Sequence, residues 1–202
     1  MGLTYSSFPE GFTDNRIVFT NLADTEVENL VKLVSQQKVL PVLDYSSFRI
    51  VIEVAFHRQD FSTIFLPLWD VFQDADVCNT QEVISGIILL GSGTWISKLK
   101  FIFDQYKCTG TNEMTHDDIC MALQCIIAAL CRIWGVSQWS PETMIPLIES
   151  VADNAFVKLE KELEDGLSRE EFVAWAFDRF QETRSISDCD ALRKILESPN
   201  KP

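Results

Sequence analysis

One pattern recurs four times along this chain of 202 residues and limits the folds that it can adopt. Each copy has apolar residues spaced three and four apart, then a polar stretch with one apolar residue inside it, then a second apolar run with helical spacing. The single apolar residues of the four polar stretches are Leu43, Cys78, Met114 and Leu167. Apolar residues at these spacings share one face of a helix, so each copy predicts two helices joined by a polar loop. The pattern therefore predicts an all-α fold.

The predicted core consists of the apolar residues on these helical faces, because residues of these types are the ones most often buried. In the first helix of each copy they are Val27, Leu30, Val31 and Val34; Phe65, Leu68, Trp69 and Phe72; Leu99, Ile102, Phe103 and Tyr106; and Phe156 and Leu159. In the second helix they are Phe48, Val51 and Ile52; Val83, Ile84, Ile87 and Ile88; Ile119, Leu123 and Ile126; and Phe172 and Trp175.

A helix, a polar loop and a second helix make the layout of the EF-hand, whose paired loops join through a short two-stranded ribbon at the eighth loop residue. A helical bundle with polar connections is the alternative interpretation. The stretches LDYSSFRIVIEVAF (43–56), LWDVF and QEVISGIILLGSG (within 68–93), KLKFIFDQY (98–106) and DGLSREEF (165–172) resemble the neuronal-calcium-sensor branch of the EF-hand superfamily. Within that branch they resemble the calaxin-like subunits of the ciliary outer-dynein-arm docking complex.

The resemblance covers residues 24–180 and implies four EF-hand-like helix–loop–helix units in two paired lobes. We expect an N-terminal extension at 1–23, one lobe at 24–93, a second lobe at 94–180 and a tail helix at 181–202. The resemblance further implies a setting in the axoneme of a cilium or flagellum, with docking-complex coiled coils as partners.

Two loops have the wrong length for calcium, which needs six to eight oxygen ligands from loop positions 1 to 12, with Gly at position 6 and a bidentate Glu at position 12. The first loop, residues 35–47, is too long, carries Pro41 near the place of the Gly, and has one carboxylate, that of Asp44. The second loop, residues 73–82, is two residues short, although Glu82 keeps the register of position 12. We expect neither loop to bind calcium.

The third loop, residues 107–118, has the right length and the wrong chemistry. Lys107 places a cation at position 1, Asn112 stands at position 6, and Asp118 replaces the longer Glu at position 12. A positive charge at the first ligand position opposes a divalent ion, so we expect no metal in this loop either.

The fourth loop, residues 160–171, is the one candidate metal site. Its possible ligands at positions 1, 3, 5, 9 and 12 are Glu160, Glu162, Glu164, Ser168 and Glu171. However, Asp165 stands at position 6 and Gly166 comes one residue late. Two interpretations remain open: a weak calcium or magnesium site, or an acidic, solvated helix end at residues 160–165. No other cofactor is expected.

The formal net charge of −13, from 30 acidic and 17 basic residues, argues against nucleic acid as a partner. It suits a partner that bears Lys and Arg. Paired EF-hands form an apolar groove that accepts an amphipathic helix or a coiled coil. The aromatic residues that we expect to line such a groove are Phe65, Trp69, Phe72, Trp95, Phe103 and Trp175. The function predicted is therefore that of a non-catalytic, largely calcium-insensitive adaptor or structural subunit.

No catalytic or zinc-binding pattern is present in the sequence. Cys108 and His116 flank one loop, but no CxxC or HxxxH pair completes a zinc site. The six cysteines also lack CxxC spacing, and the chain shows neither a secretory signal nor an apolar run of membrane length. We therefore expect a reduced, cytoplasmic chain that is not an enzyme.

Two alternative functions remain. The first is a calcium sensor that uses the fourth loop. The second is a membrane-associated regulator of a channel or enzyme, since Met1 to Ser6 fit the pattern for N-myristoylation of Gly2. A contact with a membrane is expected only if Gly2 carries the lipid. We also expect Ser140 to cap a helix that begins at Pro141.

Overall fold

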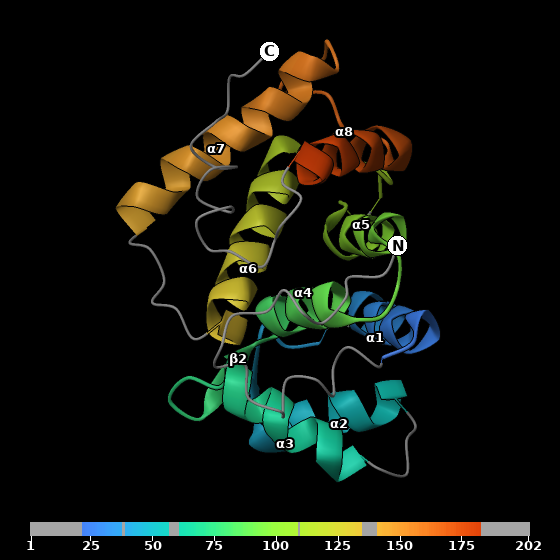
Figure 1. Cartoon of the computed structure of the whole chain (residues 1–202), viewed down its shortest axis with the longest axis vertical. Helices are drawn as coiled ribbons and strands as arrows, with labels where there is room; N and C mark the ends of the chain where they lie inside the picture. Colours follow the sequence, from blue (N-terminus) through green and yellow to red (C-terminus); the bar gives the residue numbers. More distant parts are fainter. Residues whose placement is uncertain (1–21, 38, 57–60, 109, 135–140, 183–202) are drawn as a thin grey trace. The chain divides into compact units, whose positions relative to one another are not determined.

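The structure is a computed structural model that describes residues 22–37, 39–56, 61–108, 110–134 and 141–182. Within these residues it contains eight α-helices and one two-stranded sheet (Figure 1). The helices are α1 (Asp24–Gln37), α2 (Tyr45–Phe56), α3 (Phe61–Phe72), α4 (Thr80–Leu90), α5 (Trp95–Tyr106), α6 (His116–Trp134), α7 (Pro141–Lys158) and α8 (Arg169–Glu182), and the strands are β1 (Val42–Asp44) and β2 (Val77–Asn79). The predicted all-α class is confirmed.

The described chain divides into two compact units, and each is considered by itself. The N-terminal unit contains residues 22–93 and 125–134, and the C-terminal unit contains residues 94–124 and 141–182. Helix α6 therefore begins in the C-terminal unit and ends in the N-terminal unit. Most of the predicted extension, most of the predicted tail helix, Gly2 and Ser140 lie outside the described residues.

In the N-terminal unit, α1 packs against α2 and α4, while α3 packs against α2 and α4. Tyr45 meets the rings of Phe65 and Trp69 edge-on, with centroids 5.0 and 5.2 Å away. Phe48, which is fully buried, packs against the same two rings from α2. Edge-to-face aromatic contacts of this kind stabilise a core beyond the area that they bury.

In the C-terminal unit, α8 packs against α5 and α7. The ring of Phe172 on α8 lies 6.0 Å from Phe103 on α5 and 6.0 Å from Trp175 one turn along its own helix. Across both units, every predicted core residue is buried except Val51, Leu123 and Leu159, which are partly exposed. Among the helices in the described ranges, none is both long enough and apolar enough to span a membrane.

The loops between the helices pair in two places, at the apolar residues that the repeat singles out. Strands β1 and β2 are antiparallel, with Leu43 directly opposite Cys78. In the C-terminal unit, Met114 and Leu167 face each other and exchange backbone hydrogen bonds of 2.9 and 2.8 Å. All four side chains are at most 3% exposed. The expected pairing of the loops at these residues is confirmed.

Candidate site in the four interhelical loops

The residue that follows each paired residue caps the next helix. Its side-chain oxygen accepts a backbone N–H from the first turn: Asp44 from Ser47 at 2.7 Å, Asn79 from Gln81 at 2.9 Å and Glu82 at 3.2 Å, Thr115 from Asp118 at 3.3 Å, and Ser168 from Glu171 at 3.4 Å. Such caps satisfy N–H groups that have no partner within the helix. Each of α2, α4, α6 and α8 therefore begins two residues after a paired residue, in the same register.

In the third and fourth loops the acid at position 12 also accepts a hydrogen bond from the capping residue. The carboxylate of Asp118 accepts the N–H of Thr115 at 2.9 Å and its hydroxyl at 2.8 Å. The carboxylate of Glu171 accepts the N–H of Ser168 at 2.8 Å. These are reciprocal capping boxes, so both acids already hold the start of a helix.

The shortened second loop closes through a tight hairpin turn. Asp74 and Val77 exchange backbone hydrogen bonds of 2.7 and 3.1 Å, and the two residues between them have positive φ, 48° at Ala75 and 63° at Asp76. Positive φ at both central residues is the pattern of a type I′ turn, whose twist suits antiparallel strands. The turn explains how a loop that is two residues short still places Cys78 opposite its partner.

An arginine from α6 holds the acids of this second loop. Arg132 Nε donates to Glu82 Oε2 at 2.7 Å, and its Nη2 lies 3.7 Å from Asp74 Oδ2. The side chains of Arg132 and Glu82 are only 21% and 16% exposed, so solvent screens this pair less than an open surface pair. Burial raises the pKa of the neighbouring Cys78 thiol to about 11, which keeps it uncharged at neutral pH.

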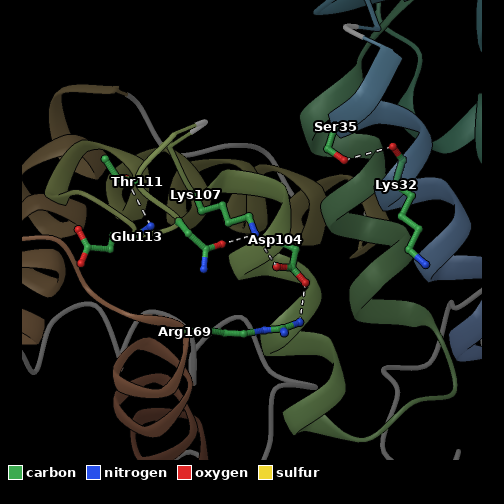
Figure 2. Close-up of polar contacts among 8 residues, drawn as sticks. Lys32, Ser35, Asp104, Lys107, Thr111, Glu113 and Arg169 are labelled. Atoms are coloured by element: carbon green, nitrogen blue, oxygen red, sulfur yellow. Dashed lines mark hydrogen bonds and ion pairs between the residues drawn. The ribbon is translucent and has the colours of Figure 1, made fainter.

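In the third loop, the Lys107 ammonium donates to one oxygen of the loop and to one oxygen of α5 (Figure 2). Its Nζ donates to Asn112 Oδ1 at 2.7 Å and to Asp104 Oδ1 at 3.2 Å. The other oxygen of Asp104 accepts Arg169 Nη2 at 2.5 Å, so one carboxylate links α5, the loop and α8. Asn112 has a φ of 59°, a conformation that Asn tolerates better than most residues.

The fourth loop opens with a helix C-cap at its first candidate ligand. Glu160 has a φ of 54°, its N–H donates to Val157 O at 3.3 Å, and the N–H of Lys161 donates back to Phe156 O at 3.0 Å. This is the Schellman arrangement, which usually places Gly at the left-handed position. The side chains of Glu160, Glu162 and Glu164 are exposed.

The ammonium of Lys161 lies among the remaining oxygens of the fourth loop. It donates to Gly166 O at 2.8 Å and to Glu171 Oε2 at 2.7 Å. The hydrogen bond from Lys161, together with those from Ser168, holds the pKa of the Glu171 carboxyl below its ordinary value of 4.5. The Lys161 ammonium therefore favours the ionised form of Glu171.

The five predicted metal ligands are placed in two groups by the structure. Glu171 and Ser168 lie together at the start of α8, whereas the three earlier glutamates point to solvent. In the part of the chain that the structure describes, no three His, Cys, Asp or Glu side chains are grouped so that they could hold a metal ion.

Gly166, which looked one residue late for a calcium loop, has a different local role. A Cβ at this residue would lie 2.6 Å from Cβ and Oε2 of Glu113, beside the pairing of Met114 with Leu167. The glycine therefore permits the close approach of the third and fourth loops.

The six aromatic residues predicted to line a partner groove lie in the cores of their own units, with one exception. Phe65, Trp69, Phe72, Phe103 and Trp175 are between 0% and 8% exposed. Trp95 is partly exposed, with Lys98 Nζ 5.1 Å from its ring centre. A partner would reach the five buried rings only after the helices of a unit separate.

One cluster has the order of a cysteine nucleophile, a base and an acid. Cys120 Sγ lies 3.8 Å from His116 Nδ1, and His116 Nε2 lies 2.9 Å from Asp153 Oδ1. However, burial, reinforced by the acidic residues Asp117, Glu149 and Asp153, raises the pKa of the Cys120 thiol to about 11. An activated nucleophilic cysteine has a lowered pKa, so this arrangement lacks the electrostatics of a catalytic thiol.

Neither a protein-family model nor a curated protein sequence matches this chain.

Proposed function

We propose that the chain is a non-catalytic adaptor built from four EF-hand-like units, largely insensitive to calcium, that binds a helical or coiled-coil protein. The observation that carries the proposal is the repeated register of the loops. In each of the four loops an apolar residue pairs with the apolar residue of another loop. The residue after it caps a helix, which begins at the next residue. A bundle with unrelated polar connections has no reason to repeat that arrangement four times.

Insensitivity to calcium follows from what already occupies the loop oxygens. Glu82, Asp118 and Glu171 stand at position 12 of their loops, and each is bonded to a cap or to a side-chain cation. A metal would have to displace those partners, and the first three loops also lack the full set of oxygen ligands. The units are held instead by their apolar cores.

The kind of partner is suggested by charge and by exposed apolar side chains. Ile50 and Val54 are one turn apart on α2 and are 61% and 44% exposed. Val42 and Val77 are 49% and 39% exposed, on neighbouring paired strands. Apolar residues on a chain with a net charge of −13 favour an amphipathic helix that carries Lys and Arg beside its apolar face. By resemblance, we propose that the partner is a coiled coil of the axonemal docking complex.

Affinity purification of the tagged full chain from ciliated cells, followed by mass spectrometry, tests this proposal. We expect an axonemal coiled-coil protein to be recovered both in a calcium chelator and in millimolar calcium. The double variant Ile50→Asp, Val54→Asp should lose it, whereas Val157→Asp, at a residue 73% exposed on α7, should retain it. Recovery of membrane channels in its place, or of the partner in calcium alone, contradicts the proposal.

A further inference from the structure

We propose that Lys161 takes the place of a metal ion in the fourth loop, and that removal of its ammonium leaves a loop that a divalent cation stabilises. The inference rests on the EF-hand-like origin of the loops proposed above, but not on any partner.

The two oxygens that Lys161 binds are those of two calcium ligands in a loop of this kind. Counted from Glu160, Gly166 stands at position 7, whose ligand is the backbone carbonyl, and Glu171 stands at position 12, whose ligand is the carboxylate. Lys161 Nζ donates to both, at 2.8 and 2.7 Å. An ammonium is a compact positive charge with three donors, so it can join an oxygen from the middle of the loop to one from its end.

The backbone shows how a lysine at position 2 enters its own loop. Glu160 adopts the left-handed conformation and ends α7, so the chain reverses immediately before Lys161. Glu160 itself is exposed, while the Lys161 side chain is 25% exposed and the Glu171 side chain 33% exposed. The Lys161 ammonium therefore lies between the fourth loop and α8. Glu160, the acid expected to bind a metal at position 1, lies outside this site.

In two of the other loops a protein cation also binds an oxygen of the loop. Lys107 at position 1 of the third loop donates to Asn112 at position 6, and Arg132 donates to Glu82 at position 12 of the second loop. Thus three loops in the described residues each have a protein cation bonded to an oxygen of their own sequence. A tethered cation stabilises its loop at any calcium concentration, whereas a bound ion stabilises it appreciably only when its free concentration exceeds the dissociation constant.

Loss of the ammonium would leave a cluster of unneutralised oxygens. Glu171 would keep its bond from the Ser168 N–H, and the Gly166 carbonyl would lose the donor from Lys161. Glu162 and Glu164, exposed on the same loop, could then turn toward a divalent ion. The position 6 residue, Asp165, is not the usual Gly, so we expect affinity no better than the weak end of such sites, about 0.1–1 mM.

The test compares melting temperatures of the full chain in a chelator and in millimolar calcium chloride. The variants are Lys161→Met, which removes the charge; Lys161→Met with Glu171→Gln, which also removes the carboxylate; and Lys158→Met, a matched charge change at an exposed residue of α7. In the chelator we expect Lys161→Met to melt about 3–6 °C below the wild type. Calcium should restore most of that loss, but not in the double variant.

Addition of calcium should change the melting temperature of neither the wild type nor Lys158→Met. Three results overturn the inference: a Lys161→Met variant as stable as the wild type, a destabilised variant that calcium does not restore, or a wild type that responds as strongly as the variant. The second result would make Lys161 an ordinary ion-pair partner. None of these results depends on recovery of a partner, so the two proposals fail separately.

Discussion

Gly86 in α4 lies where the ring of Phe72, the last residue of α3, leaves no room for a side chain. A Cβ at residue 86 would lie 2.3 Å from Cζ and 3.0 Å from Cε1 of that ring. Phe72 is 1% exposed, so the ring cannot move toward solvent without opening the core of the N-terminal unit. We therefore predict that Gly86→Ala destabilises the chain, although Ala is the better helix former.

The expected magnitude is the difference between two opposing effects. Helix propensity favours Ala over Gly by about 1 kcal/mol within a helix. Overpacking of a close-packed core costs about 1–3 kcal/mol, and a contact at 2.3 Å with a buried ring belongs at the upper end. The net loss in the free energy of unfolding for Gly86→Ala is then about 1–2 kcal/mol.

A second substitution separates this contact from a general effect of the methyl group. Phe72→Leu removes the ring atoms that the new Cβ would meet, so in that background Gly86→Ala should be neutral or stabilising. Urea unfolding followed by circular dichroism gives the four free energies of the cycle. The reasoning is refuted if Gly86→Ala stabilises the chain with Phe72 present, or if its cost is unchanged with Leu at residue 72.

Three further predictions address the loops and the cysteines. Ala75→Gly should raise the free energy of unfolding by about 1 kcal/mol in urea titrations, because Ala75 holds a φ of 48°; a loss of stability would argue against the hairpin turn. The pKa of Asp44 lies below its ordinary value of 3.8, chiefly because its carboxylate accepts the Ser47 N–H. The stabilisation that the ionised Asp44 gives to the folded state is therefore complete above the unfolded-state pKa and is lost as the pH falls through the folded-state pKa. Wild type should therefore lose stability relative to Asp44→Asn below about pH 4. Equal pH profiles would contradict this. At neutral pH a thiol reagent should react fast with exposed Cys108 and slowly with Cys120, whose pKa is raised to about 11; Cys108→Ser should remove a fast phase that Cys120→Ser leaves intact.

The parts of the fold that could be predicted are those encoded locally and repeated. The buried face of each helix follows from the spacing of its apolar residues, because residues three and four apart lie on the same face. The opposition of Met114 and Leu167, and of Leu43 and Cys78, follows from a register shared by all four loops. The hairpin turn of the second loop was not anticipated, because Ala75 gives no sequence signal for a positive φ.

The cations of the loops could not be read from the sequence, because they depend on distant or unusual geometry. Arg132 reaches Glu82 from 50 residues further along the chain. Lys161 reaches Glu171 only because Glu160, a residue that rarely takes a positive φ, ends the preceding helix. The one signal in the sequence is a lysine next to a candidate ligand, Glu160.

The predicted partner groove shows the same limit of sequence reasoning. Aromatic side chains such as Trp69 and Trp175 are equally suited to a core and to a binding surface, and composition does not separate the two. In the structure they are buried, while the three most exposed large apolar residues, Val157, Leu40 and Ile50, are aliphatic. Which face of a helix stays open is decided by the packing of its neighbours.

The affinity of the purified chain for its recovered partner helix, measured by calorimetry in calcium and in chelator, tests the central claim most directly. Coupling between a calcium site and a partner site changes such an affinity by about 5- to 150-fold. Because the cations of Lys161, Lys107 and Arg132 already occupy loop oxygens, we predict the same dissociation constant under both conditions. A wild-type affinity that is tenfold or more tighter in calcium would contradict a calcium-insensitive adaptor.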